Sequence, residues 1–164
     1  MENFKLTWKE RYVSILLLII GIIYLALQIL SMLTTESRSS DIEEDTIRLN
    51  KSEIYSDIRT FLTIFFCVAG AILLLKKKQA GWIMSLPVLI IFSIIVSSGW
   101  KNVVNMNLFD LSFILLAGAT ILLLLALIVL LLPYTREKYG IYKKQYIVTA
   151  ILLAVLSFFY FWLQ

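Results

Sequence analysis

The sequence contains no histidine and only one cysteine, Cys67, among its 164 residues. Without histidine, the chain lacks the most common general base near pH 7 and the most common zinc ligand. A single cysteine excludes an intrachain disulfide and a thiolate metal cluster, and its place inside an apolar run indicates a packing role. We also find no glycine-rich phosphate loop, no paired carboxylates and no metal-ligand spacing. The sequence therefore predicts neither an enzyme nor a protein that binds a cofactor or a metal.

Charge is also scarce where transport proteins need it, because the middle of every long apolar run is free of ionisable side chains. Pumps and ion-coupled transporters usually place acidic or basic groups there, so coupled transport is disfavoured. The net charge is +4, but the basic residues lie in short clusters beside apolar runs rather than along one polar face. They indicate membrane topology and contacts with lipid headgroups, and they do not indicate a nucleic-acid partner.

Hydrophobic residues are abundant: they make up 60% of the chain, and the mean hydropathy is +0.89. Five apolar runs cover all or most of a hydrocarbon core of about 30 Å at a rise of about 1.5 Å per residue. The sequence thus predicts an all-α integral membrane protein, a single membrane domain over residues 1–164 built as a bundle of five transmembrane helices. The expected helices are residues 13–33, 58–75, 82–98, 111–132 and 146–163, with a polar outer loop over residues 34–57.

Orientation follows from the basic turn Lys76-Lys77-Lys78, which cannot lie in hydrocarbon and is typical of a cytoplasmic membrane face. The same orientation puts ten basic residues inside and five outside, with the N-terminus in the cytoplasm and the C-terminus outside. The composition suits the cytoplasmic (inner) membrane of a bacterium. Ser40 and Glu43 have capping-box spacing, which predicts a short helix over residues 41–49 in the outer loop.

Few polar residues lie at membrane depth. Gln28 is the strongest polar group in the first run, and we expect its amide to bond across to Thr63 or Ser93. Pro87 removes a backbone hydrogen bond, so a kink is expected in the third helix, with the carbonyl of Ile83 freed.

Two groups of residues near the membrane faces could take part in catalysis or in lipid binding. Ser97, Ser98 and Lys101 lie within about one helical turn, as a serine-lysine hydrolase would require, but helix-terminal serines more simply bond their own backbone. We therefore expect no catalytic residue. Lys76, Lys77 and Lys78 are the candidate contacts for anionic lipid headgroups, each contributing about 1 kcal/mol.

Small residues recur at the same place in two runs. Ala69-Gly70-Ala71 and Ala117-Gly118-Ala119 are offset by 48 residues, and each follows an outer phenylalanine by the same distance. Helices in lipid approach most closely at small residues. The expectation is that Gly70 and Gly118 face the bundle interior at similar depth and touch each other or a shared third helix.

These observations favour a non-catalytic structural or accessory component of the membrane. Its expected partners are membrane lipids, another membrane protein or a second copy of the chain. One alternative is a subunit of a small channel or exporter, lined by serine, threonine and Gln28. The other is a sensor or immunity-type module that binds a cationic ligand through the acidic outer loop, residues 34–57.

Overall fold

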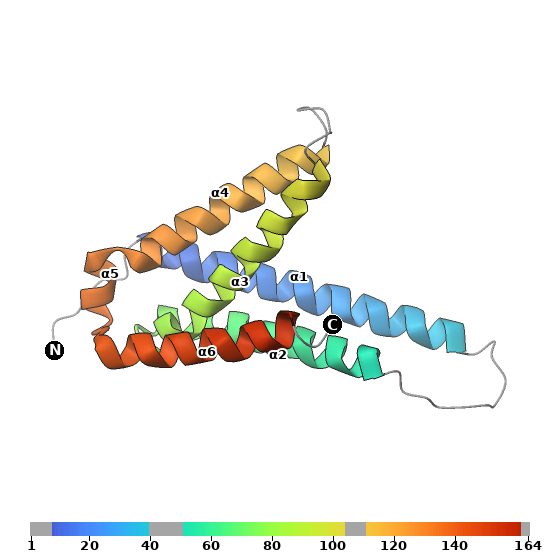
Figure 1. Cartoon of the computed structure of the whole chain (residues 1–164), viewed down its shortest axis with the longest axis horizontal. Coiled ribbons are helices and arrows are strands. Elements are labelled where there is room, and N and C mark those ends of the chain that lie inside the picture. Colours follow the sequence, from blue (N-terminus) through green and yellow to red (C-terminus); the bar gives the residue numbers. More distant parts are fainter. Residues whose placement is uncertain (1–7, 40–50, 104–110, 162–164) are drawn as a thin grey trace.

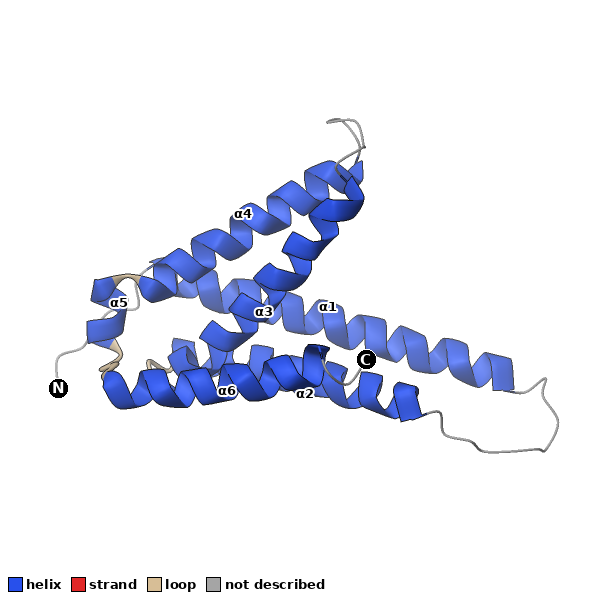
Figure 2. Ribbon diagram, viewed as in Figure 1, coloured by secondary structure: helices blue, strands red, loops and turns tan. Residues whose placement is uncertain are grey.

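Every element in the described part of the chain is a helix (Figures 1 and 2). The computed structural model describes the backbone of residues 8–39, 51–103 and 111–161, and the side chains of residues 8–33, 57–101 and 111–161. The helices are α1 (Trp8–Ser39), α2 (Lys51–Leu75), α3 (Gln79–Val103), α4 (Leu111–Leu131), α5 (Pro133–Lys138) and α6 (Lys143–Phe161). Five of these, all except α5, are long and apolar enough to cross a membrane. The predicted all-α class is confirmed for the described residues.

The polar loop is shorter than the sequence predicted. Helix α1 continues to Ser39 and α2 begins at Lys51, so both ends of the expected loop over residues 34–57 are helical. Hydropathy marks only the apolar part of a helix, whereas its backbone hydrogen bonds continue into polar residues. The predicted helix over residues 41–49 lies entirely within residues 40–50, which are outside the described residues.

The short helix α5 was not predicted. It begins at Pro133, a residue that suits the first helical position because its fixed φ is already helical. It ends at Lys138, and two residues later Gly140 has a φ of +62°, with the Ile141 amide donating to the Arg136 carbonyl at 2.9 Å. This is a Schellman cap. Together, α5 and its cap turn the chain from α4 back into α6.

Helix α3 lies at the centre of the bundle and packs against α2, α4 and α6. Helix α1 packs against α2 and, less extensively, α4. The α3–α4 pair diverges from α1 and α2 with distance from α5 (Figure 1). Buried apolar residues come from every long helix and most often from α3; the α3 members are Trp82, Leu86, Val88, Leu89, Ile91 and Phe92.

Two ends of the bundle differ in charge. We call the end that holds the start of α1, the α2–α3 turn, α5 and the start of α6 the basic end (Figure 1). It carries Lys9, Arg11, Lys76, Lys77, Lys78, Arg136, Lys138, Lys143 and Lys144. The opposite end, where α3 and α6 finish, is called the far end. Among the residues whose side chains are described, its basic members are Arg59 and Lys101.

Candidate functional site

A buried ion pair joins the start of α1 to α5 at the basic end. Lys138 Nζ donates to Glu10 Oε2 at 2.7 Å, and the two side chains are only 4% and 2% exposed. The Tyr139 hydroxyl next to it donates to the Leu74 carbonyl at 3.1 Å. Burial, and then the Glu10 carboxylate, raise the pKa of Tyr139, so its hydroxyl keeps the proton that it donates. These contacts clamp α5 against α1 and α2.

Side-chain bonds to backbone carbonyls also join the helices at this end. The Trp82 indole N–H donates to the Leu130 carbonyl at 2.9 Å, and Gln79 Nε2 donates to the Gly140 carbonyl at 2.5 Å. Since a buried carbonyl needs a partner, these bonds satisfy groups beside the α4–α5 break and the cap after α5. Their role is structural.

The lysine triplet that ends α2 is fully on the surface. Lys76, Lys77 and Lys78 are all exposed, and Lys77 has a φ of +56°. The Lys78 amide donates to the Leu73 carbonyl at 2.9 Å, so this turn is also a Schellman cap, with lysine in the left-handed position that glycine usually fills. The three charges project from a tight turn rather than from a recess.

Gln28 is buried, but its partner differs from the expected one. Its Nε2 donates to Asp57 Oδ1 at 2.7 Å, which joins α1 to the start of the membrane-length part of α2. The expected bond between helices is thus present, but it goes to Asp57 on α2 rather than to Thr63 or Ser93, whose hydroxyls donate to carbonyls of their own helices. Gln28 therefore pairs with a carboxylate near the far end.

The two glycines of the small-residue patches, Gly70 and Gly118, have different surroundings. A Cβ on Gly70 would lie 2.7 Å from Ser85 Oγ, so Gly70 packs against α3. A Cβ on Gly118 would have no atom within 4 Å among the described residues. The expectation that Gly118 packs closely inside the bundle is therefore wrong, because α4 turns this residue away from its neighbours. Pro87 is fully buried within α3, which continues through it as a helix.

The closest helix approach lies elsewhere, at Gly81. A Cβ there would lie 2.4 Å from the Leu74 backbone nitrogen and 2.6 Å from the Leu73 carbonyl carbon. The start of α3 thus rests directly on the α2 backbone, an approach that only glycine permits. Sequence reasoning missed this position, because a lone glycine after a basic turn resembles any turn glycine.

The far end contains a cavity of about 340 Å³. Four helices form its wall: α1 supplies Tyr24, α2 supplies Arg59 and Thr60, α3 supplies Ile94, Ile95 and Ser98, and α6 supplies Tyr160 and Phe161. One cation, four hydroxyl groups and apolar side chains therefore meet in one place. A volume of this size suits a small ligand, whose pockets are typically about 300 to 1,000 Å³.

Arg59 is the charged group of the far-end cavity. Its guanidinium lies over the Tyr160 ring, with the carbon 5.8 Å from the ring centroid, a cation–π arrangement. Among the described side chains, Arg59 forms no ion pair. Its charge therefore remains available to an anion that enters the cavity.

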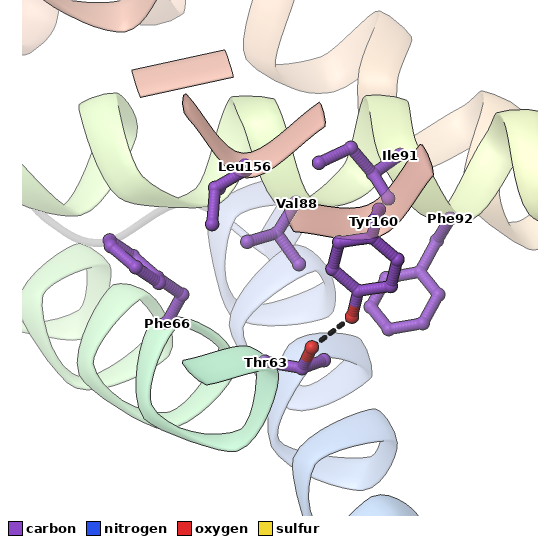
Figure 3. A pocket seen from close by; sticks show the side chains of 7 residues that line it. All are labelled: Thr63, Phe66, Val88, Ile91, Phe92, Leu156 and Tyr160. Carbon is purple, nitrogen blue, oxygen red and sulfur yellow. Dashed lines mark hydrogen bonds between the residues drawn. The ribbon is translucent and has the colours of Figure 1, made fainter. Parts of the chain in front are cut away.

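Tyr160 also lines a second, narrow and mainly apolar cleft, whose side chains are shown in Figure 3. The hydroxyls of Thr63 and Tyr160 point toward each other and form a hydrogen bond. Because the Thr63 proton is given to the Arg59 carbonyl, Tyr160 is the donor in that bond. The cleft has a volume of only about 10 Å³.

The serines near Lys101 bond their own helix. Ser97 Oγ donates to the Ser93 carbonyl at 2.6 Å, and Ser98 Oγ donates to the Ile95 carbonyl at 2.7 Å. Ser98 lines the far-end cavity, whereas Lys101 does not. The sequence did not predict that Arg59 and Tyr160, which lie on different helices, would line one cavity. Both residues lie near the outer ends of their predicted helices, residues 58–75 and 146–163. This shared position is the feature of the sequence that could have linked them.

No known protein family, curated protein or solved structure matches this chain.

Proposed function

We propose that this protein is a non-catalytic accessory component of a bacterial cytoplasmic membrane that binds an acidic amphiphile in the far-end cavity. In this proposal all five long helices cross the bilayer, and the basic end faces the cytoplasm. The distribution of the basic residues supports that orientation, since lysine and arginine are enriched on the cytoplasmic side of membrane proteins. The far-end cavity then opens toward the outer leaflet.

The observation that carries ligand binding is the joining of Arg59 with apolar walls in one cavity. The free edge of the guanidinium suits a carboxylate or a phosphate, because its planar fork of N–H groups matches either anion. Ile94, Ile95 and Phe161 provide apolar contacts for the first carbons of an attached chain. The rest of that chain would lie in the surrounding bilayer.

The two alternatives have less support. A channel would use polar side chains to line a path, but buried Ser14 and Thr63 donate to the backbone carbonyls of their own helices. A sensor that uses the acidic outer loop concerns mainly residues 40–50, which lie outside the described residues. Association with another membrane protein or a second copy remains compatible with amphiphile binding.

The test compares Arg59→Gln with Lys101→Gln in detergent-purified protein. Both variants remove one positive charge from the same end, but only Arg59 lines the cavity. Hydrogen bonds to charged groups contribute about 1.5 to 3 kcal/mol, so Arg59→Gln is expected to weaken binding of hexadecyl phosphate by about 10- to 150-fold.

Native mass spectrometry would count the bound amphiphile, with hexadecyl phosphocholine as the probe that carries no net charge. The parent and Lys101→Gln should retain hexadecyl phosphate in preference to hexadecyl phosphocholine. Equal retention of the acidic probe by Arg59→Gln and Lys101→Gln would contradict the proposal. No retention by the parent protein would also contradict it.

A further inference from the structure

A second recess, with a volume of about 370 Å³, lies at the basic end where α5 turns into α6. Its polar lining consists of Arg136 and Glu137 from α5, Tyr142 from the connecting turn, and Lys143 and Tyr146 from the start of α6. It shares no residue with the far-end cavity. Its two basic groups therefore form a separate candidate site for an anion.

Arg136 lines this recess and is held in position by a hydrogen bond to α6. Its Nη1 donates to the Tyr146 hydroxyl at 2.8 Å, which fixes the guanidinium beside α6. Its Nε is buried and has no hydrogen-bond partner among the described residues. Because Nε is covered by protein, an anion in the recess would meet the terminal N–H groups of the guanidinium, which suit anionic oxygens.

The start of α6 adds to the positive potential. Lys143 is the first residue of a 19-residue helix, and Tyr142, just before it, gives its amide N–H to Gln145 Oε1 at 2.9 Å. Amide N–H groups in the first turn of a helix point outward without partners in that helix and attract anions. The ammonium group of Lys143 strengthens this attraction.

Glu137 is the one acid in the lining, and it does not neutralise the site. Its side chain is exposed, and it forms no ion pair with Arg136 or Lys143. An anion is therefore expected on the side of the recess formed by Arg136, Lys143 and Tyr146. This position contrasts with the lysine triplet, whose charges are exposed on a turn and surround no recess.

We propose that this recess binds the phosphate group of an anionic membrane lipid. Exposed apolar side chains of α6, including Ile147 and Ile151, follow the recess along the helix and would contact the acyl chains. The inference concerns the end opposite to the far-end cavity and does not depend on amphiphile binding there. It replaces Lys76, Lys77 and Lys78 with Arg136 and Lys143 as the specific headgroup contacts.

The first test compares neighbouring lysines. Both lysines are exposed, but only Lys143 lines the recess. Since one basic charge contributes about 1 kcal/mol near an anionic lipid, Lys143→Gln should weaken binding of phosphatidylglycerol by about 5-fold. Lys144→Gln should bind like the parent. Affinity would be measured on the detergent-purified full chain by lipid titration with native mass spectrometry.

The second test uses Arg136→Gln against a variant with Lys76, Lys77 and Lys78 all replaced by glutamine. Removing Arg136 should weaken binding by about 10-fold or more, because hydrogen bonds to a charged group are lost. The triple variant loses more charge but should keep most of the affinity. If Arg136→Gln does not fold, the comparison of Lys143→Gln with Lys144→Gln tests the same site.

Phosphatidylcholine and inorganic phosphate are the two comparison ligands, titrated into the same detergent-purified protein. Preference for phosphatidylglycerol over phosphatidylcholine, with little competition by inorganic phosphate, would support the proposal. Competition by inorganic phosphate at a concentration similar to that of the lipid would overturn the lipid assignment. Equal weakening by Lys143→Gln and Lys144→Gln would overturn the site, as would a larger loss in the triple variant than in Arg136→Gln.

Discussion

Replacing Gly81 by alanine is expected to destabilise the protein by about 3 kcal/mol, at the upper end of the usual cost of overpacking. The added methyl group would lie 2.4 Å from the Leu74 backbone nitrogen. Backbone atoms cannot rotate away as the end of a side chain can, so α3 must move off α2. That movement would also disturb the Trp82 bond to the Leu130 carbonyl, since Trp82 is the next residue.

The matched control for this prediction is Gly118→Ala. A Cβ at Gly118 has no described atom within 4 Å, and alanine favours a helix over glycine by about 0.5 to 1 kcal/mol. Gly118→Ala should therefore be neutral or slightly stabilising. Both variants would be unfolded by SDS titration in mixed micelles, followed by circular dichroism. Equal stability of Gly81→Ala and Gly118→Ala would refute the proposed close approach of α2 and α3.

The second large effect is expected at the buried ion pair. Removing one partner of a buried pair leaves the other charge without compensation and typically costs about 3 to 5 kcal/mol. Both Glu10→Gln and Lys138→Met should therefore destabilise the protein strongly. The cost should appear as release of α5 from α1, since the pair joins residues 128 positions apart in the sequence.

A double-mutant cycle distinguishes the pair from the separate side chains. The variant with both Glu10→Gln and Lys138→Met should be more stable than the sum of the two single losses implies, because no unpaired charge remains. Lys144→Met, an exposed lysine on α6, controls for loss of charge at the same end. Strictly additive losses at Glu10 and Lys138 would show that the two groups do not act as a pair.

Much of the architecture could be predicted from hydropathy. The long helices of the structure correspond to the five apolar runs, because in lipid a helix is the way in which a single segment satisfies its own backbone. The extensions of α1 and α2 into polar sequence could not be predicted this way. Helix α5 could not be predicted from hydropathy either, because a six-residue helix in a charged segment is too short to show a helical pattern of apolar residues.

The sites were harder to predict than the helices. Whether a glycine is packed depends on how its helix is rotated about its axis, and the similar patches at Gly70 and Gly118 have opposite surroundings. The pairing of Glu10 with Lys138 could not be predicted, because nothing in the local sequence shows that residues 128 positions apart meet. Arg136 likewise was counted only toward orientation, although its contact with Tyr146 spans just ten residues.

Orientation in the membrane is the central claim of this account, because it assigns the two recesses to opposite leaflets. The most direct measurement is a pair of fusions to a reporter enzyme that is active only outside the cytoplasm, one after Gln79 and one after Gln164. The account predicts activity after Gln164 and none after Gln79. Activity after Gln79, or a cytoplasmic reporter that works after Gln164, would contradict the five-span arrangement with a cytoplasmic basic end.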